Sequence, residues 1–253
     1  MLHVHEWGDP DGPPVICLHG VVAHGRRFRR LAEERLGHLR VLAFDLRGHG
    51  RSTWEPPWTL AQHVEDALET MRSAGIERAP LIGHSFGGRL ALELTAHGVV
   101  ERSVLIDPAV WVPPPIALER AELERVDRSF ASRAEALEAR MPTARLAPRE
   151  VLEQELDDHL VRDGNGRWRY RYLQSAVVAA YGELAQPPPD WERLRVPTLL
   201  VAGAESDVVP EVVVDVFRHE LGDLIEVAVV PGGHIPLWDA YEETADAIER
   251  FLA

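Results

Sequence analysis

The sequence predicts an α/β fold in which a mostly parallel sheet is flanked by helices and interrupted by an inserted helical segment. Short apolar runs alternate along the chain with longer amphipathic stretches, which is the pattern of a parallel sheet covered by helices. Between Trp111 and Trp191 this alternation stops, and the chain becomes rich in glutamate and arginine. The first observation predicts the sheet, and the second predicts the insertion.

The strands are predicted from the apolar runs, and the helices from the amphipathic stretches between them. The predicted strands are His3–Trp7, Pro14–Leu18, Val41–Phe44, Pro80–Gly83, Ser103–Ile106, Thr198–Ala202 and Ile225–Val230. The predicted helices are at about Arg26–Leu36, Leu60–Ala74, Gly87–Ala96, Pro210–Leu221 and Pro236–Leu252. Their alternation places a helix after nearly every strand.

Two proline runs mark the edges of the strand-free block. They occupy residues 113–115 and 187–189. Proline runs favour extended, semi-rigid connections, which suits the two stems of an inserted unit. We therefore expect residues 1–110 and 191–253 to form one α/β core, and residues 111–190 to form a helical insertion.

The composition excludes several classes of function. The chain has 253 residues and a formal net charge of −14, which disfavours nucleic acid and anionic membranes as partners. No stretch approaches the ~20 apolar residues of a membrane helix, and no signal peptide is visible, so membrane insertion is not expected. Cys17 is the sole cysteine, which precludes an intrachain disulfide and predicts a cytoplasmic location. Lysine is absent, which excludes Schiff-base chemistry on a lysine.

The stretch Gly83-His84-Ser85-Phe86-Gly87 matches G-x-S-x-G directly after a predicted strand and directly before a predicted helix. A sharp strand-to-helix turn leaves little room for Cβ atoms on either side of the serine, which explains the two glycines. The serine hydroxyl then projects from the carboxyl edge of the sheet, beside a helix N-terminus. Ser85 is therefore the predicted nucleophile.

A serine nucleophile needs a general base, and His234 is the predicted one. It follows the last predicted strand in PGGHIPLW, where a glycine pair allows a turn over the sheet edge. His19 and His49 lie in loops near the same edge and are second-rank candidates. His84 adjoins the serine too closely to reach it.

The base needs a carboxylate to fix its tautomer. Asp207, in VAGAESDVVP after the penultimate strand, is the leading candidate. Asp107, in VLIDPA after an earlier strand, is the competitor, and Glu205 is a weaker one. The order Ser85, Asp207, His234 agrees with the nucleophile–acid–histidine order of serine hydrolases built on a parallel sheet.

An oxyanion hole requires two convergent donors. One is predicted to be the N–H of Phe86, and the other that of Val21, with Val22 as the alternative. The two common glycine-rich phosphate-binding motifs, GxxxxGK[ST] and GxGxxG, are both absent from the sequence. His19, His24 and His49 could bind a metal, but no carboxylate or cysteine spacing supports a site, so no metal is expected.

With these residues in place, the chain resembles the α/β-hydrolase superfamily, specifically its small cofactor-free esterase-like members. The similar pieces are LHG (18–20), FDLRGHGRS (44–52), GHSFGG (83–88), GAESD (203–207) and GGH (232–234). The resemblance implies that residues 111–190 form a cap over the active site. It also implies that Ser85, His234 and Asp207 act as nucleophile, base and acid, with no cofactor.

The expected reaction is hydrolysis of a small carboxylic ester or lactone through an acyl-enzyme intermediate. His19, Gly20, Trp54 and Trp111 are the residues expected to contact the substrate. Two alternatives stay open: a carbon–carbon bond hydrolase or lyase with the same triad, and a non-catalytic ligand receptor of the same fold. An arginine-rich cap that reaches the pocket would favour the carbon–carbon hydrolase.

Overall fold

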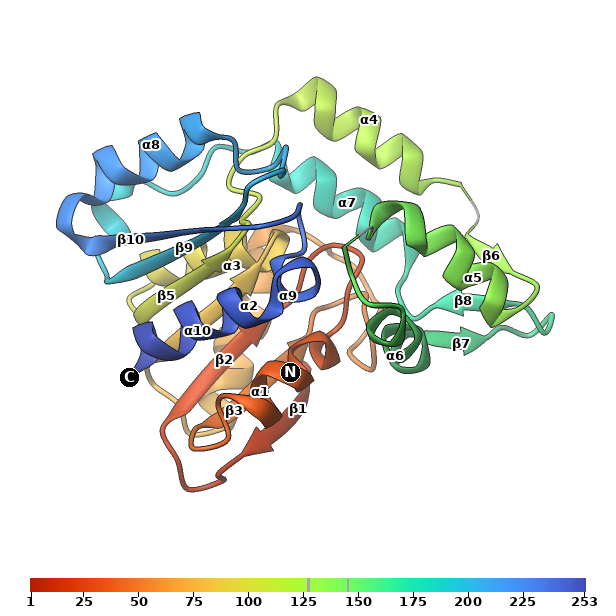
Figure 1. Ribbon diagram of the computed structural model, residues 1–253, viewed down its shortest axis with the longest axis horizontal. Coiled ribbons are helices and arrows are strands. Elements are labelled where there is room, and N and C mark those ends of the chain that lie inside the picture. The colour runs from red at the N-terminus through yellow and green to blue at the C-terminus, as the bar shows by residue number, and fades with distance from the viewer. Residues whose placement is uncertain (127, 145) are drawn as a thin grey trace.

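The computed structural model describes every residue except 127 and 145, and its centre is a sheet with the strand order β1-β3-β2-β4-β5-β9-β10 (Figure 1). β1 runs antiparallel to β3, and the other neighbouring pairs of this sheet run parallel. The predicted fold class, a mostly parallel sheet flanked by helices, is confirmed. The strands are β1 (His3–Gly8), β2 (Pro14–Leu18), β3 (Arg40–Asp45), β4 (Ala79–His84), β5 (Val100–Ile106), β9 (Thr198–Gly203) and β10 (Ile225–Val230).

Successive residues of each inner strand pack against helices on opposite faces of the sheet. Along β2, Ile16 and Leu18 belong to one apolar cluster, whereas Val15 and Cys17 belong to another. The first cluster includes residues of α2, α3 and α8, and the second includes residues of α1 and α10. These helices are α1 (Arg29–Glu34), α2 (Leu60–Ser73), α3 (Phe86–Ala96), α8 (Glu211–Leu221) and α10 (Tyr241–Leu252).

Two predicted helices are divided in the structure. The stretch predicted at 26–36 begins with a 3-10 turn, η1 (Gly25–Phe28), before α1. The stretch predicted at 236–252 consists of α9 (Pro236–Asp239) and α10, separated at Ala240 by a non-helical backbone with a φ of −145° and a ψ of 62°. The carboxylate of Asp239 accepts a hydrogen bond from the Gly233 N–H at 2.9 Å, so the end of α9 is turned toward the preceding loop.

The segment between β5 and β9 forms its own layer beside the sheet (Figure 1). Contrary to expectation it contains strands, which form a small antiparallel sheet of order β6-β8-β7. The reason lies in the alternating sequence around β8: Trp168 and Tyr170 pack on a local apolar cluster, whereas Arg169 is paired with Asp163. Its elements are α4 (Pro114–Glu124), β6 (Ser129–Phe130), α5 (Arg133–Arg140), η2 (Met141–Thr143), α6 (Arg149–His159), β7 (Leu160–Arg162), β8 (Trp168–Tyr170) and α7 (Gln174–Leu184).

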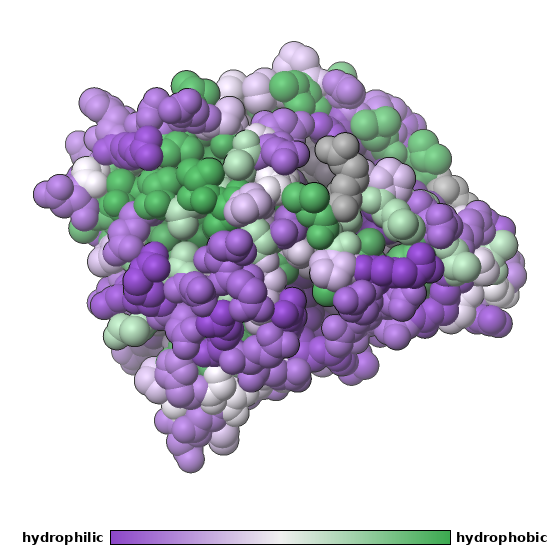
Figure 2. Space-filling model, viewed as in Figure 1, coloured by the Kyte–Doolittle hydropathy of each residue, from purple (hydrophilic) through white to green (hydrophobic). Residues whose placement is uncertain are grey.

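The opposite end of the molecule exposes an apolar surface. Figure 2 shows this surface in the region of α8 and β10, away from the segment between β5 and β9. Val212, Val216 and Val229 are exposed there. In the described parts of the chain, no helix is both long enough and apolar enough to cross a bilayer.

The glycine at the start of α3 gives a testable consequence of this packing. A Cβ on Gly87 would lie 2.0 Å from the Leu18 carbonyl oxygen, which is backbone and cannot move aside. We expect Gly87→Ala to lower the free energy of unfolding by at least ~2 kcal/mol in chemical denaturation, because α3 must separate from β2. Gly182→Ala in α7 is the control, since no atom lies within 4 Å of its added Cβ. An unchanged midpoint for Gly87→Ala would contradict the close approach.

The buried histidines predict acid sensitivity. Burial lowers the pKa of His63 to about 3, aided by the neighbouring His49. Between about pH 6.5 and pH 3 the unfolded chain binds a proton at this position that the folded chain does not, so stability falls as the pH drops. We expect His63→Leu to reduce the stability lost between pH 7.5 and pH 5 by about 2 kcal/mol in denaturation experiments. The same change at exposed His97 should leave that pH dependence unaltered; equal effects at both positions would refute the assignment.

Candidate active site

Ser85 lies at the turn between β4 and α3, in a backbone conformation that non-glycine residues rarely adopt. Its φ is 54° and its ψ is −116°. The two flanking glycines are required there, because a Cβ on Gly83 would lie 2.3 Å from the Gly87 carbonyl oxygen. The side chain stands at the carboxyl end of β4, as the sequence motif predicts.

His234 contacts both a serine and an aspartate. Its Nε2 lies 2.8 Å from Ser85 Oγ, and its Nδ1 lies 2.6 Å from Asp107 Oδ2. Since a carboxylate only accepts hydrogen bonds, Nδ1 carries the proton and Nε2 is left to accept from the serine hydroxyl. His84 donates from Nε2 to the His234 carbonyl oxygen at 2.8 Å and so holds the backbone of the loop that carries His234. Burial lowers the pKa of His84 well below its usual range, aided by neighbouring His234.

The carboxylate beside His234 is that of Asp107, so the prediction of Asp207 at this place is wrong. Asp107 is fully buried, with a φ of 43°, and it also accepts hydrogen bonds from the Gly203 N–H at 3.1 Å and the Ser206 hydroxyl at 2.6 Å. Ser206 thus points toward the site, and the next residue points away from it. Asp207 is exposed and forms an ion pair of 3.3 Å with Arg120 of α4.

The loop after β2 lies against the serine. A Cβ on Gly20 would be 3.1 Å from Ser85 Cβ. The Ala23 N–H donates to the Gly20 carbonyl oxygen, which closes a turn with Val21 and Val22 at its centre. Within the described parts of the chain, no hydrogen bond uses the N–H of Val21 or of Phe86. Both predicted oxyanion donors are therefore free to donate a hydrogen bond, and their convergence on one anion stays a prediction.

His19 and His49 hold this loop and do not replace His234. His19 is fully buried, accepts from the Leu46 N–H with Nε2 and donates to the Gly20 carbonyl oxygen with Nδ1. Neither nitrogen is left for a substrate, which corrects the expected role of its side chain. His49 Nε2 lies 2.5 Å from the Val21 carbonyl oxygen. Burial lowers the pKa of both rings.

The two tryptophans expected to contact the substrate differ in their surroundings. Trp54 is exposed. Trp111 is half exposed, and its indole N–H donates to the Ala185 carbonyl oxygen at 3.2 Å, where the inserted segment joins the core. Their contact with a substrate stays a prediction.

A buried charged cluster, not predicted from the sequence, joins the inserted segment to the core. Glu155 of α6 contacts the guanidinium of Arg27 and lies 3.1 Å from His24 Nε2, with His159 beside it. Burial alone would raise the pKa of Glu155, but the Arg27 charge and His24 hold it well below its usual range. His24, Glu155 and His159 are close enough to share a metal ion, as are His3, His5 and Asp45. Arg27 already neutralises Glu155, which disfavours a cation in the first group.

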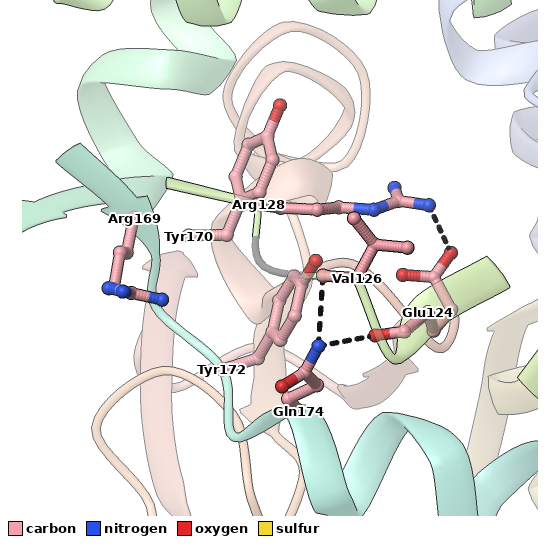
Figure 3. A pocket seen from close by; sticks show the side chains of 7 residues that line it. All are labelled: Glu124, Val126, Arg128, Arg169, Tyr170, Tyr172 and Gln174. Carbon is pink, nitrogen blue, oxygen red and sulfur yellow. Dashed lines mark hydrogen bonds and ion pairs between the residues drawn. The ribbon is translucent and has the colours of Figure 1, made fainter. Parts of the chain in front are cut away.

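A small pocket lies within the inserted segment (Figure 3). Its volume is about 50 Å³, and Tyr170 and Tyr172 stack along it with ring centroids 5.8 Å apart. The Tyr172 ring lies 6.0 Å from that of His49, which connects the pocket wall to the Val21 loop. The remaining lining residues are Glu124, Val126, Arg128, Arg169 and Gln174.

Comparison with known proteins agrees with this geometry. Residues 15–247 match the model of the alpha/beta hydrolase family. Lipase LipV of Mycobacterium tuberculosis is 38% identical over 190 residues, which are 73% of this chain and 72% of the lipase. An sn-1-specific diacylglycerol lipase of Xenopus tropicalis is 30% identical over 212 residues, which are 79% of this chain and 65% of that protein.

Among solved structures, E-2-(acetamidomethylene)succinate hydrolase superposes with a TM-score of 0.86 at 23% identity, covering 99% of this chain and 94% of the other. At that identity the likeness concerns the fold. The strained serine at the strand-to-helix turn, its contact with His234 and the family match together show that this chain belongs to the alpha/beta hydrolase family.

Proposed function

We propose that the protein is a serine hydrolase that cleaves a small carboxylic ester or lactone, with Ser85 as nucleophile, His234 as general base and Asp107 as the acid. The observation that carries the proposal is the unbroken chain from Asp107 through His234 to Ser85, with contacts of 2.6 and 2.8 Å. A buried carboxylate, an oriented imidazole and a serine on a strained turn are the parts that acyl transfer requires.

The reaction follows from these contacts. Ser85 Oγ attacks the carbonyl carbon while its proton passes to His234 Nε2, and the buried Asp107 carboxylate stabilises the resulting imidazolium. The N–H groups of Phe86 and Val21 stabilise the oxyanion. The imidazolium then protonates the leaving alcohol, and His234 activates a water that releases the acid. In a lactone the leaving alcohol is part of the acyl chain, so the first step opens the ring and the second releases a single hydroxy acid.

The relatives favour an ester over a carbon–carbon bond. LipV and the Xenopus protein are both named lipases, and lipases act on carboxylic esters. The pocket arginines that would suit an acidic diketone are already paired: Arg128 contacts Glu124 at 2.9 Å, and Arg169 contacts Asp163 at 2.7 Å. In this proposal residues 111–190 are the cap that selects the substrate, and the pocket lined by Tyr170 and Tyr172 is part of the substrate-binding surface of that cap.

The direct test is acid release from short acyl esters and lactones, measured by pH-stat. We expect turnover that disappears in Ser85→Ala, whose folding should be unchanged because the mutation removes one hydroxyl from a site held by backbone packing. A fluorophosphonate should label the wild-type protein at Ser85 and leave the variant unlabelled, as mass spectrometry would show.

The outcomes of this test separate the alternatives. Labelling of Ser85 without acid release from any ester or lactone would overturn ester hydrolysis and favour carbon–carbon cleavage. The absence of both would favour a ligand receptor. Acid release that persists in Ser85→Ala would remove the serine from the mechanism.

The position of the acid is tested by a matched pair of variants. We expect Asp107→Asn to lower kcat roughly ten-thousand-fold, because an amide cannot stabilise the imidazolium and favours the wrong tautomer of His234. Asp207→Asn should stay within about twofold of wild type, because an exposed ion pair with Arg120 contributes little. A larger loss of activity for Asp207→Asn than for Asp107→Asn in steady-state kinetics would show that Asp207 is the acid.

A further inference from the structure

Arg89 of α3 is a fully buried cation one helical turn after the nucleophile. Its exposed fraction is 1%, and its N–H donates to the Ser85 carbonyl oxygen at 3.2 Å within the first turn of the helix. It is among the largest side chains that the described chain buries completely. A buried guanidinium is costly unless all its hydrogen bonds are made. Its partners therefore indicate what the residue is for.

The Arg89 guanidinium makes four hydrogen bonds and an ion pair. Nη1 donates to the carbonyl oxygens of Val110 at 2.8 Å and of Gln186 at 3.0 Å, and Nη2 donates to that of Pro187 at 2.7 Å. Nε donates to Glu93 Oε1 at 2.9 Å, and Nη2 lies 2.8 Å from the same oxygen in the ion pair. Glu93 thus supplies the counterion from the same helix, and the backbone carbonyls supply the rest.

The three carbonyls belong to the two places where the chain leaves and re-enters the core. Residues 110–112 lead into α4, and residues 184–187 begin at the last residue of α7 and continue past it; we call these two stretches together the neck. They also bind each other, since the Val112 N–H donates to the Leu184 carbonyl oxygen at 2.9 Å. Arg89 is therefore bonded to both halves of the neck and, through its own helix, to the turn that bears Ser85.

The geometry of the acceptors requires a guanidinium. Two carbonyls from one stem and one from the other converge on a planar group with a fixed fork of donors. A lysine would keep the charge beside Glu93, but it has three donors on a flexible stem and cannot satisfy both stems and the carboxylate in the same directions. This difference separates the anchoring role of Arg89 from a general requirement for a buried positive charge.

We propose that Arg89 is a positioning residue that fixes both stems of the inserted segment to the nucleophile helix, and so sets where the cap stands relative to Ser85. The consequence for catalysis rests on the proposed function, in which that segment binds the bulk of the substrate. Hydrolysis of an ester with a short acyl group, which reaches only Ser85 and the turn at Val21, should not depend on Arg89. A bulky acyl group that also touches the cap should bind less well when the neck is loosened.

Amide hydrogen exchange of the full chain tests the anchoring itself, without any substrate. We expect Arg89→Lys to speed exchange in the neck residues that carry an amide hydrogen, 110–112 and 184–186, by about tenfold or more, while exchange in the inner strands β2, β4 and β9 stays as in wild type. Arg102→Lys is the matched control, because Arg102 also donates to a carbonyl oxygen, that of Phe251, but at the C-terminus and away from the neck. Exchange unchanged in the neck, or accelerated equally across the sheet, would overturn the proposal.

Kinetics with a matched pair of esters tests the consequence. For Arg89→Lys we expect KM for a bulky acyl ester to rise about tenfold with a smaller change in kcat, and kcat/KM for the acetyl ester of the same alcohol to stay within about twofold. Equal loss on both esters would show that Arg89 supports the fold in general and would overturn the positioning role. A wild type that releases acid from neither ester would contradict the proposed function, and the exchange experiment alone would then decide the anchoring.

Discussion

The turn at Ser85 is the constraint from which the geometry of the site follows. The helix α3 starts so close to the end of β2 that Gly87 has no room for a Cβ against the Leu18 carbonyl oxygen. That contact forces Ser85 into its positive φ and sets Gly20 beside the serine. Because these are contacts of backbone with backbone, the nucleophile and the turn at Val21 are placed without help from the substrate. The strain at Ser85 is maintained by packing on every side of it.

The sequence shows these backbone-determined features well and the acid poorly. The apolar runs predicted the central strands to within a few residues, and Ser85 and His234 meet as their positions after β4 and β10 predicted. Asp107 and Asp207 both follow strands that end at the same edge of the sheet, so the sequence does not show which carboxylate reaches His234. The prediction of Asp207, in the loop after β9, is therefore wrong. Ser206, one residue earlier, faces the site instead and donates to Asp107. In an irregular loop the direction of a side chain changes with each residue, and no periodicity in the sequence reports it.

The inserted segment shows a second limit of the sequence. The proline runs and the change of composition predict where it begins and ends, but they do not predict the small sheet around β8, because its strands are only two or three residues long. Its attachment to the core was also hidden. Glu155 reads as one more exposed acid of a charged helix, yet it is buried against Arg27 and His24, residues more than a hundred positions earlier in the chain. Such pairs depend on how two units dock, and a buried charge is stable only once its partner has arrived.

The carboxylate that contacts His234 lies close in sequence to the inserted segment. Asp107 directly follows β5, and the neck begins three residues later at Val110, whose carbonyl oxygen Arg89 binds. Between them the Ala109 N–H donates to the Ser85 carbonyl oxygen at 3.1 Å. The chain that carries the acid is therefore bonded first to the nucleophile and then to its helix before it enters the inserted segment. The Ala109 bond holds the end of β5 to the Ser85 turn without Arg89, so loosening the neck should move the inserted segment while Asp107, His234 and Ser85 stay in contact.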